Sequence, residues 1–503
     1  MPSLVLATSD PLATLAAALL LAVVALALLA AVYHDRPAFV PARPEVPQLK
    51  PSWPLVGSLP HLLALRKRGV RFLDESLRQQ REVAPGGKPY TMALPGRFFG
   101  GRIYVVNNPA YIKTVQKDVE LWLKGKAVQT IISDFLGPHG IFVSDGDVWY
   151  HQRKLSSHIF SIQSFRHEIQ TSVLADLHKL DALCQDSIAQ RKTVALPDVF
   201  HRFTLEAFTK LAFGVDLNTL PDNVAGLETQ VTFAACFDYC QSFVERRPFS
   251  LVPLWAERFT APGRKYHDSV RYLYDFSRSL IDQRYDAREK GTAESASKGG
   301  KDLLQLFIDA GCPRGDLPAV ILNFMIAGRD TTAQALSWFM FEMYLHPDIA
   351  QRVRQEIWTN LGRAPQRDLE YDDYKKLPYL NAAFYESIRL HPNVPLTRKR
   401  AARDTVLHPT LDEATLPGKD LPSLPVRKNE AVQFSDYVIA RMPEVWGEDC
   451  EEFKPERFLS EDGSLKQHSN FLFRAFNSGP RLCLGKNLAT YEGMAVIAHL
   501  LGK

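Results

Sequence analysis

Apolar residues are most concentrated at the start of the chain. Residues 11–32 read PLATLAAALLLAVVALALLAAV, 22 residues without a charge. A helix of that length crosses the roughly 30 Å hydrocarbon core of a bilayer. A cleaved signal peptide is the alternative, but this run is longer than a usual signal core and no basic region precedes it, since Asp10 is the only nearby charge. We predict a retained membrane anchor at residues 1–33.

Prolines dominate the segment that follows. They recur every few positions between residues 34 and 60, at Pro37, Pro41, Pro44, Pro47, Pro51, Pro54 and Pro60. Such spacing favours a stiff, extended connector. The pattern therefore predicts a linker at residues 34–60, which holds a body of residues 61–503 at a fixed attitude to the membrane.

The body shows two kinds of periodicity. Residues 90–109, YTMALPGRFFGGRIYVVNNP, read as short strands joined by turns, and prolines with short β-like runs return at about 393–435. Most of the stretch between them, about 109–390, has helical apolar spacing, interrupted by a polar surface loop at 286–302. The sequence therefore predicts a fold that is mainly α with small β-sheets.

One predicted helix, beginning near Pro318, is apolar around nearly its whole circumference and should run through the core. Arg329 and Asp330 at its centre argue against a second membrane span, because charges at a bilayer midplane cost a few kcal/mol each. The Thr331 hydroxyl can bond a carbonyl one turn back, so we expect the helix to open locally beside a ligand. A kinked core helix with internally satisfied polar groups is the alternative.

Composition and charge narrow the class of protein. The chain has 503 residues, 46% of them hydrophobic, which is enough for a substantial core. A net charge of +4, with no block of basic residues interleaved with aromatics, argues against a nucleic-acid partner. Basic residues follow the apolar span, so the positive-inside rule places the body in the cytosol, which in a eukaryotic cell indicates a single-pass protein of the endoplasmic reticulum membrane. These residues are Arg36, Arg43, Lys50, Arg66, Lys67 and Arg68.

The cysteines carry the main chemical signal. Six are scattered along the chain, and in a cytosolic body they imply no disulfide framework. Cys483 alone stands in a glycine-punctuated loop, FNSGPRLCLG, directly before the helical pattern KNLATYEGMAVIAHLL. The amides and dipole of a helix N-terminus favour a thiolate, which can ligate a metal.

A single cysteine in this loop excludes a zinc or iron–sulfur cage there and leaves a metal whose other ligands come from a cofactor, as in thiolate-ligated haem. Gly479 and Gly485 let the backbone turn tightly and approach a flat ligand, and Phe476 can cover one face of Cys483. The alternative is a free buried cysteine in a Gly/Pro loop.

The string F-x-x-G-x-R-x-C-x-G resembles the haem-binding signature of the cytochrome P450 family, and the likeness extends from about Pro51 to the end of the chain. It matches at Phe476, Gly479, Arg481, Cys483 and Gly485. The resemblance implies a P450-like fold behind the N-terminal transmembrane helix. It also implies haem b with its iron ligated by Cys483 and one propionate bound by Arg481.

Three further motifs resemble the same family. AGRDTT resembles its oxygen-activation motif, in which Asp330 and Thr331 would relay protons. The helix GDVWYHQRKL places Trp149 and Arg153 four residues apart; alone this is more often a packing pair, but in the family such a pair contacts a haem propionate. His151 and His158 on the same helix are the alternative iron ligands.

The third motif is E-x-x-R followed by P-E-R-F. Glu386 and Arg389 lie three residues apart on one helix face, and a solvated ion pair of little energetic weight is one reading. The resemblance implies instead that Glu386, Arg389 and Arg457 form a buried structural cluster beneath the cysteine loop.

The resemblance implies a monooxygenase that uses O₂ and NADPH-derived electrons from a cytochrome reductase to hydroxylate a lipophilic substrate. Basic residues are expected to form the reductase-docking face. They are Arg153, Lys154, Lys454 and Lys486. The phrases HGIFVSDGDVW and LNFMIAGRDTTAQALSWF are most similar to the plant and fungal fatty-acid ω-hydroxylase branch. By position, residues 131–142, 326–327 and 394–396 would line the pocket.

Two other functions remain open at this point. One is a haem-thiolate isomerase or dehydratase of lipid peroxides, although such members of the family usually lack the acid–alcohol pair. The other is a non-catalytic haem-binding protein, because the chain stops at Lys503 where the family's chains continue through more helix and a β-hairpin.

Overall fold

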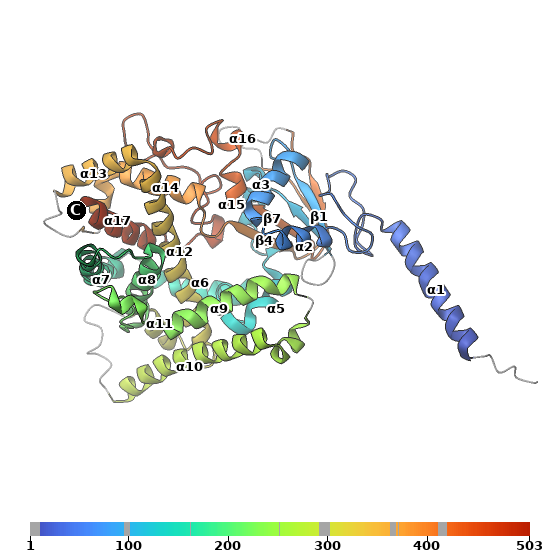
Figure 1. Ribbon diagram of the computed structural model, residues 1–503, viewed down its shortest axis with the longest axis horizontal. Coiled ribbons are helices and arrows are strands. Elements are labelled where there is room, and N and C mark those ends of the chain that lie inside the picture. The colour runs from blue at the N-terminus through green and yellow to red at the C-terminus, as the bar shows by residue number, and fades with distance from the viewer. Residues whose placement is uncertain are drawn as a thin grey trace, which may run out of the picture.

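The computed structural model describes residues 11–94, 101–160, 162–250, 252–290, 302–362, 369–370, 372–410 and 420–503 (Figure 1). Helices make up most of the body and a small sheet lies at one side of it, next to the N-terminal helix. The predicted fold class, mainly α with small β-sheets, is confirmed.

Helix α1 covers Pro11–Val32, the 22 residues of the apolar run. It projects away from the body, and its segment Thr14–Val32 is a candidate membrane span with a mean hydropathy of 3.0 and no buried residue (Figure 1). Its leucines and valines are exposed because no part of the described body packs against them. This is the arrangement expected of a helix whose solvent is lipid.

The helices of the body follow in chain order. They are α2 (Leu59–Lys67), α3 (Phe72–Val83), α4 (Pro109–Lys117), α5 (Gly125–Leu136), α6 (Gly146–Ile159), α7 (Ile162–Gln190), α8 (Leu196–Phe213), α9 (Thr232–Arg246), α10 (Ala261–Glu289), α11 (Leu303–Asp309), α12 (Leu317–Leu345), α13 (Pro347–Leu361), α14 (Pro378–Leu390), α15 (Asp436–Ile439), α16 (Pro443–Trp446) and α17 (Lys486–Gly502). Short 3₁₀ turns matter at η6 (Pro455–Phe458) and η7 (Gly479–Arg481).

The larger sheet has five strands in the order β1-β2-β7-β4-β3. β2 and β7 pair in parallel, and the other neighbours are antiparallel. A two-stranded sheet of β5 and β6 lies apart from it. The strands are β1 (Tyr90–Leu94), β2 (Gly101–Val105), β3 (Trp122–Leu123), β4 (Leu396–Ala401), β5 (Thr405–Leu407), β6 (Leu424–Val426) and β7 (Ala431–Ser435). Both regions with strand patterns therefore form strands.

The second half of the predicted linker belongs to the folded body. Leu49 is buried and donates its N–H to Thr91 O at 2.8 Å, and Thr91 donates back to Pro47 O at 2.7 Å. Ser58 likewise donates to Ala93 O at 2.8 Å. The prolines keep this segment extended, as predicted, but an extended segment can also pair with a strand, here β1.

α12 runs through the middle of the helical part, as its all-round apolar pattern predicts (Figure 1). It is helical from end to end, so the local opening expected beside Thr331 is absent from this structure. Thr331 Oγ1 nevertheless donates to Ala327 O at 2.8 Å, one turn back. Gly328 is required by packing, because a Cβ there would lie 2.1 Å from the Phe208 ring of α8.

The predicted polar loop at 286–302 begins later than expected. α10 continues to Glu289, and Asp302 caps α11 by accepting the N–H of Gln305 at 2.9 Å. Residues 291–301 lie outside the described part of the chain.

Candidate active site

The cysteine loop is built around one tight turn. Gly479 has φ +63°, and a Cβ on it would lie 2.5 Å from Gln116 O of α4, so only glycine fits. The next residues form η7, and Cys483 N–H donates to Phe476 O at 2.8 Å, which closes the loop. α17 begins at Lys486, three residues beyond Cys483, as the sequence predicts.

Cys483 remains exposed, whereas the other five cysteines are buried or half-buried. Protein nevertheless packs densely around the thiol, and this burial raises its pKa, although the Gly485 N–H and the charges of Arg153 and Lys486 act in the other direction. The open surface of the sulfur therefore faces the interior of the fold. The Gly485 N–H at the start of the helix acts in favour of the thiolate, as predicted, while desolvation acts in favour of the thiol; a bound metal ion would remove the proton.

Trp149 and Arg153 lie on α6 and face the cysteine loop. The Arg481 guanidinium stacks on the Trp149 ring at 4.2 Å, and Arg153 lies 5.9 Å from the same ring. Arg481 Nη2 donates to Asp145 Oδ1 at 2.8 Å, and Asp145 also accepts the backbone N–H groups of Lys124 and Gly125, each at 3.1 Å. Asp145 thus holds Arg481 of the cysteine loop next to the start of α5.

Two lysines that the sequence analysis missed join this group. Lys399 of β4 is buried, and burial together with the Arg481 charge lowers its pKa to about 7. Burial, then Arg481 and Lys399, lowers the pKa of Lys124 well below its ordinary value. Neither lysine belongs to a motif, and each is far in sequence from Cys483. The three consecutive cations Arg398, Lys399 and Arg400 inside a β-like run were the available signal for Lys399.

The donor set fits the haem group that the resemblance implies. Lys124, Lys399 and Arg481 lie near one carboxylate, Asp145, and Arg153 lies near Arg481, so cationic side chains outnumber carboxylates in this cluster and burial lowers the pKa of each of the four. Arg481 Nε is buried and has no acceptor among the described residues. Two propionate carboxylates would neutralise the excess and supply the missing acceptors.

α12 supplies Asp330 and Thr331. Five residues at this level of the helix are half-buried, namely Ile326, Ala327, Gly328, Thr331 and Gln334, and of these Ala327, Thr331 and Gln334 share one partly open face. Asp330 points elsewhere, toward α9, where it accepts a hydrogen bond from Gln241 Nε2 at 2.6 Å. The acid and the alcohol are therefore neighbours in sequence whose side chains face α9 and the interior, respectively.

Two asparagines join the expected pocket segments to α12. Asn323 accepts the Phe142 N–H at 3.0 Å and donates to Leu136 O at 2.6 Å, which fixes the stretch between α5 and α6. Asn393 Nδ2 donates to Thr331 O at 2.8 Å, so the segment before β4 also lies against the helix. Residues 131–142 thus contact α12 at Asn323, about two turns before Thr331, and the segment that leads into residues 394–396 contacts the helix at Thr331 itself.

Glu386 lies between two arginines. Its Oε2 accepts Arg389 Nε at 2.6 Å, and its Oε1 accepts Arg457 Nε at 3.2 Å. Glu386 is fully buried, and both arginines also donate to backbone carbonyls: Arg389 to Cys450 O at 2.9 Å and Arg457 to Trp446 O at 2.7 Å. α14 is thereby bonded to the irregular segment that runs from α15 to η6. The alternative interpretation of Glu386 and Arg389 as a solvated surface ion pair is wrong, because both side chains are buried.

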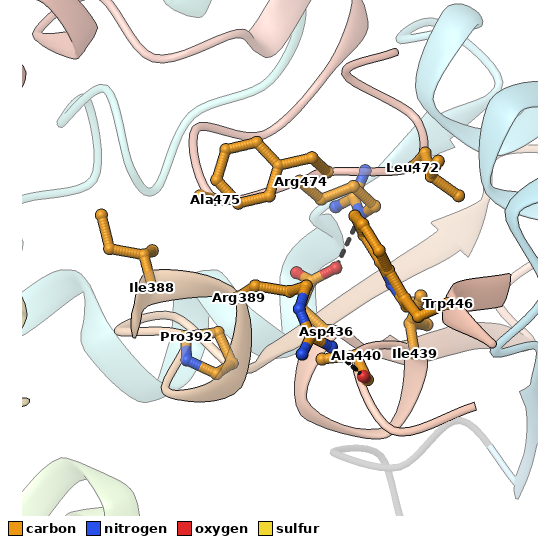
Figure 2. A pocket seen from close by; sticks show the side chains of 11 residues that line it. Ile388, Arg389, Pro392, Asp436, Ile439, Ala440, Trp446, Leu472, Arg474 and Ala475 are labelled. Atoms are coloured by element: carbon orange, nitrogen blue, oxygen red, sulfur yellow. Dashed lines mark hydrogen bonds and ion pairs between the residues drawn. The ribbon is translucent and has the colours of Figure 1, made fainter. Parts of the chain in front are cut away.

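Arg474 links this support to the cysteine loop. Its Nε donates to Asp436 Oδ1 at 2.7 Å, and its Nη1 donates to Ser478 Oγ at 2.7 Å, next to Gly479. Figure 2 shows Arg389, Asp436 and Arg474 around one small cavity of about 20 Å³, with Trp446 on its wall. This volume has room for about one water molecule, so the support is close-packed rather than a ligand site.

The chain was compared with known proteins. The family description "Cytochrome P450" matches residues 47–503. "Cytochrome P450 monooxygenase cyp1" of Mycosarcoma maydis is 34% identical over 90% of this chain and 68% of its own length. "Cytochrome P450 CYP94D108" of Paris polyphylla is 31% identical over 91% of this chain and 87% of its own, and "Cytochrome P450 94A1" of Vicia sativa is 28% identical over 90% and 84%.

Proposed function

This chain belongs to the cytochrome P450 family of monooxygenases, and we propose that it hydroxylates the terminal region of a long-chain fatty acid at a membrane surface. The anchor α1 carries this proposal, because an enzyme held at a bilayer receives a linear amphiphile directly from the lipid. The likeness of its α12 and cysteine-loop phrases to the fatty-acid ω-hydroxylase branch gives the substrate class.

When bound through the Cys483 thiolate, haem would supply the activation of O₂, so that with two electrons and two protons one oxygen atom enters a C–H bond of the substrate and the other leaves as water. Phe476, Gly479 and Gly485 would hold the thiolate loop against the flat cofactor, and Trp149, Arg153 and Arg481 would bind its propionates. Lys124 and Lys399 join them because burial and the nearby Arg481 charge lower the pKa of each, and a propionate would favour the charged form again.

Asp330 and Thr331 are proposed to deliver protons into the pocket. The raised pKa of Asp330, which follows from its burial, makes this carboxyl a group that can hold a proton and pass it on. The Thr331 hydroxyl donates to Ala327 O, and its lone pairs remain available to accept a proton on the interior face of α12.

The electrons are proposed to come from NADPH through a cytochrome reductase that docks on the basic face containing Lys154, Lys454 and Lys486. The body is proposed to lie on the cytosolic side of the endoplasmic reticulum membrane, with α1 as its single pass. The basic residues that follow α1 support this orientation.

The test begins with the reduced-plus-carbon-monoxide difference spectrum of the full chain expressed with haem supply. A strongly red-shifted Soret band would report thiolate ligation; an unshifted band would contradict it. Laurate and oleate, with reductase and NADPH in detergent-free vesicles, should then give terminally hydroxylated acids. NADPH consumption without such products would reject the fatty acid, and turnover of a lipid hydroperoxide without reductase would favour the isomerase alternative.

A further inference from the structure

The two carboxylate oxygens of Asp330 have different surroundings. Oδ2 accepts Gln241 Nε2 of α9 at 2.6 Å. Oδ1 is buried and receives no hydrogen bond from the described residues. Arg329 Nη1 forms an ion pair with Oδ1 at 3.1 Å, while one of its two N–H groups donates to Asp238 Oδ1 of α9 at 2.6 Å. Oδ1 is therefore the oxygen of Asp330 that accepts no hydrogen bond from the described residues and that can take up a proton.

His201 of α8 faces that oxygen. Its Nε2 lies 4.0 Å from Asp330 Oδ1, and its Nδ1 lies 2.7 Å from Pro197 O. A carbonyl oxygen only accepts, so Nδ1 carries a hydrogen atom in either charge state of the ring. The exchangeable proton of His201 is therefore the one on Nε2, which faces Asp330, and 26% of the side chain is exposed to solvent.

The packing of α8 on α12 fixes this alignment. His201, Thr204 and Phe208 share one face of α8 at helical spacing. Thr204 Oγ1 donates to Arg329 O at 2.8 Å, and Phe208 packs on Gly328. The three residues of α8 thus meet three consecutive residues of α12, and His201 meets Asp330.

We propose that His201 supplies Asp330 with protons from solvent. The protonated ring passes its Nε2 proton to Asp330 Oδ1, so one N–H bond breaks and one O–H bond forms, and the neutral ring takes a new proton from water. No electron moves. The charged groups that face the pair are Arg329 beside it and Asp238 across α9, paired with each other, while Gln241 holds Oδ2. This inference rests on the proposed function, in which Asp330 serves the reaction.

His201→Gln tests the proposal, because glutamine keeps a polar side chain but does not titrate. The matched control is His499→Gln, which alters a histidine whose Nε2 lies 3.7 Å from Oδ1 of another aspartate, Asp181. Each variant is first checked for its red-shifted carbon monoxide spectrum. We expect His201→Gln to slow product formation about 10-fold, because water can still deliver protons to Asp330, although slowly. A group in contact with the reacting atoms contributes about 100-fold or more. The pH dependence of product formation across the range where histidine titrates should also disappear.

A second readout does not depend on activity. In histidine-labelled, reduced and carbon monoxide-bound protein, the His201 side-chain NMR signal is identified by its loss in His201→Gln. Introducing Asp330→Asn should change how that signal moves with pH and leave the His499 signal unaltered. An unaltered His201 signal would reject the proton contact, even if His201→Gln itself failed to fold.

The outcomes separate this inference from the proposed function. If Asp330→Asn diverts electrons to peroxide but His201→Gln behaves as His499→Gln does, His201 has no part and the proposed function stands. If Asp330→Asn leaves product formation unchanged, the acid has no role in proton delivery and the proposed function fails at that point. Loss of pH dependence in His201→Gln together with the altered NMR titration supports the proposal.

Discussion

Thr331 and Ser337 make the same hydrogen bond on the same helix, each to the carbonyl four residues back, at 2.8 and 2.7 Å. Backbone bonding therefore cannot be what distinguishes them. Thr331 lies where Asn393 brings the segment before β4 to α12, and Asp330 precedes it in the chain. At the scale of single residues, the place of Thr331 on α12, and not its hydrogen bond, therefore distinguishes it from Ser337 as a candidate for proton transfer.

Thr331→Ala should keep the red-shifted carbon monoxide spectrum and consume NADPH, but release peroxide in place of most of the product, because the alcohol no longer passes protons inward. Ser337→Ala is the control and should leave the peroxide yield as it is. Unchanged coupling of NADPH to product in Thr331→Ala would remove this residue from the mechanism.

Gly479→Ala combines two costs at one position. A non-glycine residue at a positive φ costs roughly 1–2 kcal/mol, and here a Cβ would also strike Gln116 O. Gly463→Ala is the control, since Gly463 has φ +80° and open space around it. We expect the control to lose only stability, measured as Tm, whereas Gly479→Ala also loses haem, measured as absorbance per protein. Equal haem content in the two would refute a steric role.

At the scale of elements, charges buried between helices hold the site together. Glu386→Ala should strand Arg389 and Arg457 in the protein interior, at a cost of about 3–5 kcal/mol, and abolish haem incorporation. The control is Glu456→Ala, which removes the exposed ion pair between Glu456 of the turn η6 and Arg352 of α13. This change should lower the free energy of unfolding by no more than about 1 kcal/mol. A normal haem spectrum in Glu386→Ala would show that the cluster is dispensable.

α17 carries a second buried carboxyl, Glu492, beside α7. Burial, and then the negative charge of Asp176, raises the pKa of Glu492 to about 8. The unfolded chain releases this proton at about pH 4.3, so between the two values the folded state binds more protons and stability falls as the pH rises, levelling above pH 8. Glu492→Gln should flatten the curve of Tm against pH in that window. The control Glu461→Gln changes an exposed carboxyl and should keep the wild-type curve of Tm against pH. If Glu492→Gln also kept that curve, the proton taken up by the folded state would belong to a group other than Glu492.

At the scale of the whole molecule, α1 is separable from the fold. Because none of its span is buried against the body, a chain without residues 1–33 should keep its carbon monoxide spectrum and Tm while moving from the membrane pellet to the supernatant in high salt. Replacing the span with an unrelated apolar helix should restore the pellet fraction. Loss of the spectrum in the shortened chain would mean that α1 also stabilises the body.

Local signals predicted the anchor, the core helix α12 and the cysteine loop, because each depends on residues close together in the chain. Lys124 and Lys399 could not be found in this way, since their task arises only where β4 and the start of α5 meet Arg481. The same limit applies to the linker: its prolines indicate extended backbone, but not the strand it pairs with. The desolvation that raises the pKa of Cys483 could not be predicted either, because burial depends on the whole fold.

That pairing begins almost as soon as α1 ends. Leu55 donates its N–H to Tyr33 O at 3.1 Å, one residue beyond the helix, and the segment then continues onto β1. If α1 spans the bilayer as we propose, this contact at its end restricts how far the body can tilt and turn about the anchor, so that the same face of the body would stay turned toward the lipid headgroups.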